Sequence, residues 1–176
     1  MEAGFGVGAL LASLIAAVID VRTARLPNWL TIGGLVAALL FRACVMGWAG
    51  LAAGLLGALA ACGVLLLPFL ARGIGGGDVK LMAAVGGWLG IHHALAFILA
   101  TAIAGGFLAI GYMVIQKRTS ETLLRVAHLI RFHLVSGMVL EPEPCAPSES
   151  LRFPYSLAIA SGALFVVVST SASLWG

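Results

Sequence analysis

Two aspartates stand out in this chain because almost everything around them is apolar. Of the 176 residues, 61% are hydrophobic and 10% are charged, and only seven are acidic. Five of those acids fall in the chain ends or in one polar segment, which leaves Asp20, in "DVRTARLPNWL", and Asp78, in "GIGGGDVKL". An ionisable residue at the edge of a long apolar run indicates either a functional site or simply the end of a membrane span.

The long uncharged runs predict an integral membrane protein. In a bilayer only helices satisfy all their backbone groups within one segment, and these runs lack the alternation of barrel strands. A span needs roughly 20 residues. We therefore expect an all-α bundle of six transmembrane helices forming a single domain over residues 1–176. The expected spans are residues 3–19, 29–48, 51–70, 79–90, 92–116 and 153–175, with turns at Ala49 and Gly50 and within "GGWLGIHHA".

The basic residues determine the expected orientation. With six spans, nine of the ten Lys and Arg residues lie on one side, which is cytoplasmic by the positive-inside rule, and only Arg42 lies opposite. Both chain ends are then expected outside the cytoplasm. The polar segment 117–152 becomes a cytoplasmic loop whose first half, "ETLLRVAHLIRFHLV", has the spacing of an amphipathic helix on the membrane surface.

Asp20 closes the first expected span and Asp78 opens the fourth, so both carboxylates are predicted at the cytoplasmic ends of their helices. Two close carboxylates share one proton, because like charges a few ångströms apart cannot both ionise cheaply. The ionised member draws a proton from water while the protonated member hydrogen-bonds a peptide carbonyl. This chemistry requires neither a metal nor a cofactor, and we expect neither.

Residues around the two acids have shapes that suit such a site. Pro27 and Asn28 separate two helices, and Asn28 is a good N-cap for the helix from Trp29. The glycines before Asp78, including Gly75 and Gly77, allow unusual dihedrals and the close approach of another backbone. A phosphate-binding loop is disfavoured, because G-K-[ST] is missing and an acid at the helix start repels phosphate. Lys80 is either a partner for an acidic group or a lysine that extends to the membrane interface.

Together these stretches resemble the type IV prepilin peptidases, a family of intramembrane aspartyl proteases. "DVRTARLPNWL" is similar to their D-x(n)-[IL]-P-N motif, "GIGGGDVKL" to their G-x-G-D motif, and "FPYSLAIASG" to their proline-led final span. The resemblance implies that Asp20 and Asp78 are the catalytic pair. It also implies that Gly75, Gly77, Pro27 and Asn28 shape the site.

The family's chemistry implies a substrate and a location. Its members remove a short basic leader from prepilins, before the pilin's hydrophobic helix, at the cytoplasmic face of the bacterial inner membrane. Larger members also N-methylate the pilin and carry paired C-x-x-C motifs. The three cysteines here form no C-x-x-C pair, which puts methylation in doubt. The small form resembles the peptidases of tight-adherence (Flp) pilus systems. Partners are then the prepilin and the bilayer, with no nucleic acid.

Two other classes of function remain open on the residues alone. A small transporter would use Asp20, Asp78 and Lys80 as an ion relay, although mid-span positions are almost purely apolar. A secretion-machine subunit would need no chemistry from either aspartate. His92 and His93 fall in the turn opposite the acids and are expected to lie at the membrane interface rather than to bind a metal.

Overall fold

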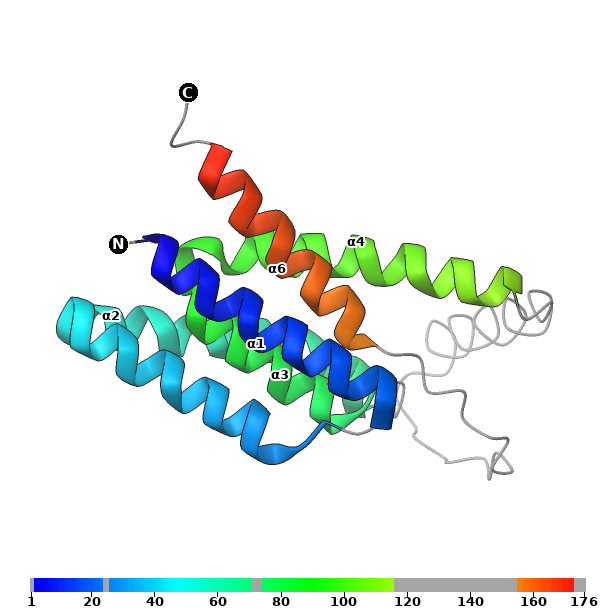
Figure 1. Cartoon of the computed structure of the whole chain (residues 1–176), viewed down its shortest axis with the longest axis horizontal. Helices are drawn as coiled ribbons and strands as arrows, with labels where there is room; N and C mark the ends of the chain where they lie inside the picture. Colours follow the sequence, from blue (N-terminus) through cyan, green and yellow to red (C-terminus); the bar gives the residue numbers. More distant parts are fainter. Residues whose placement is uncertain (1, 24–25, 71–73, 116–154, 173–176) are drawn as a thin grey trace, which may run out of the picture. The chain divides into compact units, whose positions relative to one another are not determined.

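The computed structural model describes residues 2–23, 26–70, 74–115 and 155–172, and helices are the only regular secondary structure among them. Its helices are α1 (Glu2–Thr23), α2 (Asn28–Leu70), α3 (Gly76–Leu89), α4 (Ile91–Ile115) and α6 (Tyr155–Ala172) (Figure 1). The expected all-α fold is therefore confirmed. The amphipathic helix expected in the loop 117–152 lies outside the described residues.

The chain divides into two compact units, residues 1–106 with 154–176 and residues 107–153. Of the second unit, the described part is the end of α4. All the site residues named so far belong to the first unit, in which α1 packs against α2, α3 and α6, while α3 packs against α1, α2 and α6.

Helix α2 doubles back on itself at Gly47. Gly47 has φ 62° and ψ −147°, a left-handed backbone that glycine adopts without the usual steric penalty. Beyond it the chain returns alongside its own first half: a Cβ on Gly54 would lie 3.1 Å from Cδ2 of Leu39. In a straight helix those two residues would be about 22 Å apart. The break falls at Gly47, two residues before the expected turn at Ala49 and Gly50.

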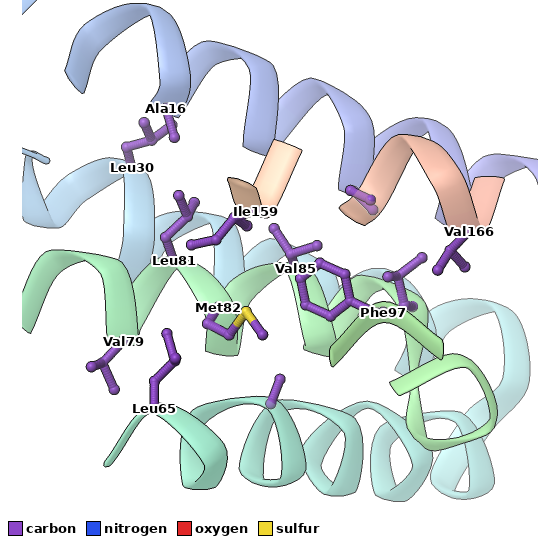
Figure 2. Close-up of a cluster of buried hydrophobic side chains, with 14 residues drawn as sticks. Ala16, Leu30, Leu65, Val79, Leu81, Met82, Val85, Phe97, Ile159 and Val166 are labelled. Atoms are coloured by element: carbon purple, nitrogen blue, oxygen red, sulfur yellow. The ribbon is translucent and has the colours of Figure 1, made fainter. Parts of the chain in front are cut away.

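Helix α3 is short and enclosed by the others. Its 14 residues extend about 21 Å, less than the roughly 30 Å of a bilayer's hydrocarbon core. None of its described side chains is among the exposed large hydrophobic ones, which are spread over α1, α2, α4 and α6. In Figure 2, Leu81 and Val85 of α3 point toward Ile159 of α6, whereas Val79 lies beside Leu65 of α2.

Very close backbone contacts hold α3 against α2. A Cβ on Gly57 would lie 2.5 Å from the carbonyl oxygen of Gly86, and a Cβ on Gly86 would lie 2.6 Å from that of Gly57. Such mutual contact is possible only between glycines, and small residues are the usual means of close helix packing in membranes. Helix α3 ends at Gly90, whose φ of 73° turns the chain into α4.

Three helices are long and apolar enough to cross a membrane, within Gly4–Thr23, Asn28–Leu70 and Ile91–Gly111. Tyr155–Ser171 is a shorter apolar helix. Large apolar side chains such as Leu59 and Phe165 are exposed on these helices, as expected for surfaces that contact lipid rather than water.

Candidate functional site

The site is built where α1 ends and α3 begins. Asp20 lies in the last turn of α1 and Asp78 in the first turn of α3, and both residues are partly buried. The start of a helix favours negative charge, because its free N–H groups give that end partial positive charge. The fold therefore places Asp78 where a carboxylate is stabilised.

Two contacts bring the segments around Asp20 and Asp78 together. A Cβ on Gly77 would lie 3.1 Å from Cβ of Leu26, so the connection between α1 and α2 packs directly on the start of α3. Lys80 Nζ donates a hydrogen bond to Oδ1 of Asn28, at 2.9 Å. Residues far apart in the sequence thus meet at one end of the first unit.

The expectation that Asn28 caps the second helix needs correction. Helix α2 already begins at Asn28, and the carbonyl of Pro27 accepts the N–H groups of Leu30 and Thr31, at 3.1 and 3.4 Å. Pro27 therefore occupies the position expected for Asn28. The side-chain oxygen of Asn28 accepts Lys80 instead, which gives Lys80 a partner that neither sequence interpretation foresaw.

The described glycines before Asp78 do not adopt the unusual dihedrals that the sequence suggested. Gly75 has φ −74° and ψ 146°, an ordinary extended backbone, and the described glycines with positive φ are Gly47 and Gly90. What Gly75 and Gly77 contribute is missing side-chain volume. Gly77 admits Leu26, and at the exposed Gly75 a Cβ would lie 3.3 Å from Oδ2 of Asp78.

Two residues of α6 that were not singled out from the sequence interact with the carboxylates. Ser156 Oγ donates a hydrogen bond to Oδ2 of Asp20, at 2.6 Å. Its neighbour Tyr155 lies near enough to Asp78 for the two to interact electrostatically. The side chains of consecutive helical residues point about 100° apart, so Tyr155 and Ser156 can face α3 and α1 from the same turn of α6. The one sequence feature that could have identified Tyr155 and Ser156 as site residues is their position just after Pro154, near the start of the last apolar run.

Other candidates lie elsewhere or carry no further chemistry here. Arg42 contacts the opposite end of α3, where its side chain bonds the carbonyls of Gly87 and Trp88. His92 and His93 lie in the first turn of α4, beside that same end. Among the described residues no group of three or more His, Cys, Asp or Glu side chains could hold a metal ion.

Apolar helices that carry two partly buried carboxylates at their ends define a multi-pass membrane protein with a candidate acid–base site. The chain belongs to the type IV leader peptidase family, whose model matches residues 7–110, a range that includes Asp20 and Asp78. The family expected from the motifs is thereby confirmed.

Two curated relatives show how much of the chain is shared. The chain is 40% identical over 113 residues to a prepilin leader peptidase/N-methyltransferase of Burkholderia pseudomallei (strain 1026b), covering 58% of this chain and 35% of that protein. It is 38% identical over 121 residues to the protein of the same name from Escherichia coli (strain K12), covering 62% and 52%. The chain thus spans about a third to a half of these relatives. No solved structure matches it.

Proposed function

We propose that this protein is an aspartic endopeptidase that removes the leader peptide from type IV prepilins, with Asp20 and Asp78 as its catalytic pair. The observation that carries the proposal is that Asp20 and Asp78, both partly buried, lie at the end of α1 and at the start of α3, and these two helices pack together. The Gly77–Leu26 and Lys80–Asn28 contacts hold the segment that follows α1 against the start of α3. The names of the relatives support the reaction and the substrate class. The proposal covers the peptidase reaction and not the methyltransferase activity that those names also include.

Peptide hydrolysis by this pair follows from their shared proton. The ionised carboxylate takes a proton from water, whose oxygen attacks the carbonyl carbon of the scissile peptide. The protonated carboxyl hydrogen-bonds the carbonyl oxygen of the intermediate and then gives its proton to the peptide nitrogen. The C–N bond then breaks as the C=O bond re-forms, the amine leaves neutral, and the proton from water stays on the first carboxyl. Partial burial strengthens both interactions relative to water, because the local dielectric constant is lower.

The substrate must reach the acids as an unwound strand, since the carbonyls of a helix are already hydrogen-bonded. Gly75 is exposed, and a Cβ at this position would lie 3.3 Å from Oδ2 of Asp78, so any side chain larger than that of glycine would crowd the carboxylate from this side. We propose this side as the approach for the residues between the basic leader and the hydrophobic helix of the prepilin.

The membrane arrangement that we propose has six spans. Helix α2 contributes two of them, one before Gly47 and one after it. The active site then faces the cytoplasm of a bacterial inner membrane, and both chain ends lie outside it, as the basic residues predict. We further propose a pilin of the tight-adherence (Flp) type as the substrate.

The test is cleavage of a co-expressed prepilin by Asp20→Asn and Asp78→Asn. Each change replaces a carboxylate by a near-isosteric amide that cannot exchange protons, so each is expected to slow cleavage about 10²–10⁴-fold. Glu2→Gln is the matched control, since Glu2 is also an acid of α1 but begins the helix rather than ending it. Normal processing by both aspartate variants, with their membrane levels unchanged, would exclude the mechanism.

A further inference from the structure

Ser156 is a fully buried hydroxyl residue at the start of α6, with 0% of its surface exposed. Its Oγ lies 2.6 Å from Oδ2 of Asp20, within the range of hydrogen bonds from a hydroxyl to an ionised carboxylate. Such bonds are about twice as strong as those between neutral groups. Helix α6 lies outside the range matched by the family model, so that match does not assign Ser156 a role.

The other serines of α6 show that this contact is unusual. Ser161, Ser169 and Ser171 each donate to a carbonyl of their own helix three or four residues earlier, at 2.8–2.9 Å. That is the ordinary behaviour of a serine within a helix. Ser156 is the second residue of α6, so no earlier turn of α6 precedes it, and its hydroxyl crosses to α1.

The contact restricts the carboxylate of Asp20. Asp20 is only partly buried, and a side chain at the end of a helix can otherwise choose among several rotamers. Because α1 and α6 pack along one another, the position of Ser156 relative to Asp20 is set by two helices rather than by a loop. A carboxylate accepts through both of its oxygens, so the hydrogen bond to Oδ2 does not occupy Oδ1, which can take the proton of a water.

We propose that Ser156 is a positioning residue that holds Asp20 in the orientation needed to take a proton from the attacking water. This inference rests on the proposed function, because it assigns Ser156 a task in that reaction. Ser156 acts only through Asp20 and does not touch the substrate. Its loss should therefore slow the chemical step without weakening the binding of the prepilin.

The experiment compares kcat and KM for leader removal by the purified full chain in detergent. Ser156→Ala deletes the hydroxyl and keeps the Cβ; it should lower kcat about ten- to a hundredfold while KM stays within twofold. Ser161→Ala makes the same deletion in the same helix at an exposed site, and both constants should stay within twofold of the wild type. Ser156→Thr keeps the hydroxyl and should recover most of the lost kcat.

The thermal midpoint of every variant shows whether it folds. If a Ser156 variant does not fold, Ser156→Cys replaces it, because cysteine is similar in size to serine and is a weaker hydrogen-bond donor. A wild-type kcat for folded Ser156→Ala would overturn the inference, as would a change in KM alone or an equal loss in Ser161→Ala. Asp20→Asn distinguishes a failure of the positioning role of Ser156 from a failure of the proposed catalytic pair. If Asp20→Asn is inactive while Ser156→Ala is normal, only the positioning role fails; if Asp20→Asn is active, the proposed catalytic pair fails.

Discussion

The stability of the bundle should depend strongly on Arg42, a buried cation of α2 with 6% of its surface exposed. Its Nε lies 3.0 Å from the carbonyl oxygen of Gly87, and Nε and Nη2 lie 3.2 and 2.9 Å from that of Trp88. These are among the last carbonyls of α3, which have no partner within their own helix. Arg42 thus completes the hydrogen bonding of an enclosed helix end.

The cost of Arg42→Met can be worked from these contacts. A hydrogen bond from a charged donor contributes about 1.5–3 kcal/mol, and bonds between helices in membranes average nearer 0.6 kcal/mol. The guanidinium also lies 4.5 Å from the ring centre of Phe5, a cation–π contact that contributes about 1 kcal/mol. For two carbonyls and one ring we expect a loss of about 3 kcal/mol. That corresponds to a fall of about 6–12 °C in the thermal midpoint for a chain of this size.

The assay is thermal unfolding of the purified protein in one detergent, followed by circular dichroism. Arg42→Lys should fall between the wild type and Arg42→Met, because a single ammonium cannot reproduce the planar fork. Arg22→Met is the matched control, since Arg22 is exposed in the last turn of α1. Its midpoint should fall by no more than about 4 °C, because an exposed cation at a helix end contributes at most about 1 kcal/mol. If Arg42→Met unfolds at the wild-type temperature, then the carbonyls at the end of α3 do not depend on Arg42.

Two further predictions concern packing and Lys80. Gly57→Ala should destabilise the protein by about 1–3 kcal/mol, because its Cβ would meet the backbone of Gly86; Gly63→Ala, with nothing within 4 Å, should gain about 0.5–1 kcal/mol. Equal midpoints for these two variants would contradict the close contact of α2 and α3. Lys80→Met and Asn28→Ala should affect unfolding through the same bond, so the double variant should have the midpoint of the less stable single one. Additive losses in that cycle would show that Lys80 and Asn28 act separately.

Much of the fold was predictable because a bilayer permits few alternatives. Long apolar runs must be helices, and Gly90 stands where two of them divide. The break in α2 was less certain, since "MGWAG" offers both Gly47 and Gly50; the structure uses Gly47, while Gly50 lies tightly against the carbonyl of Arg42. Which of two neighbouring glycines turns the chain depends on packing that the local sequence does not encode.

The site was predictable only where residue type implied chemistry. Asp20 and Asp78 are recognisable because carboxylates are rare in an apolar chain. Ser156 is not, because most serines in helices bond their own backbone, as Ser161 does. The pairing of Lys80 with Asn28 joins residues 52 positions apart and requires the packed structure.

The free N–H and C=O groups at the two ends of α3 need polar partners from the protein, because α3 is shorter than the bilayer core and is enclosed by other helices. Arg42 places a cation at the carbonyl end, and Asp78 places an acid at the N–H end, each matching the partial charge of that helix terminus. In the proposed enzyme Asp78 is the protonated member of the pair when Asp20 takes the proton from water, so its interaction with the start of α3 is weaker than that of a full charge. Asp78→Asn should therefore lower the unfolding free energy by no more than about 1 kcal/mol, the upper value for an exposed charged group at a helix end. A loss of that size leaves the bundle folded, so a thermal midpoint measured beside the cleavage assay separates the catalytic effect of Asp78 from its structural one.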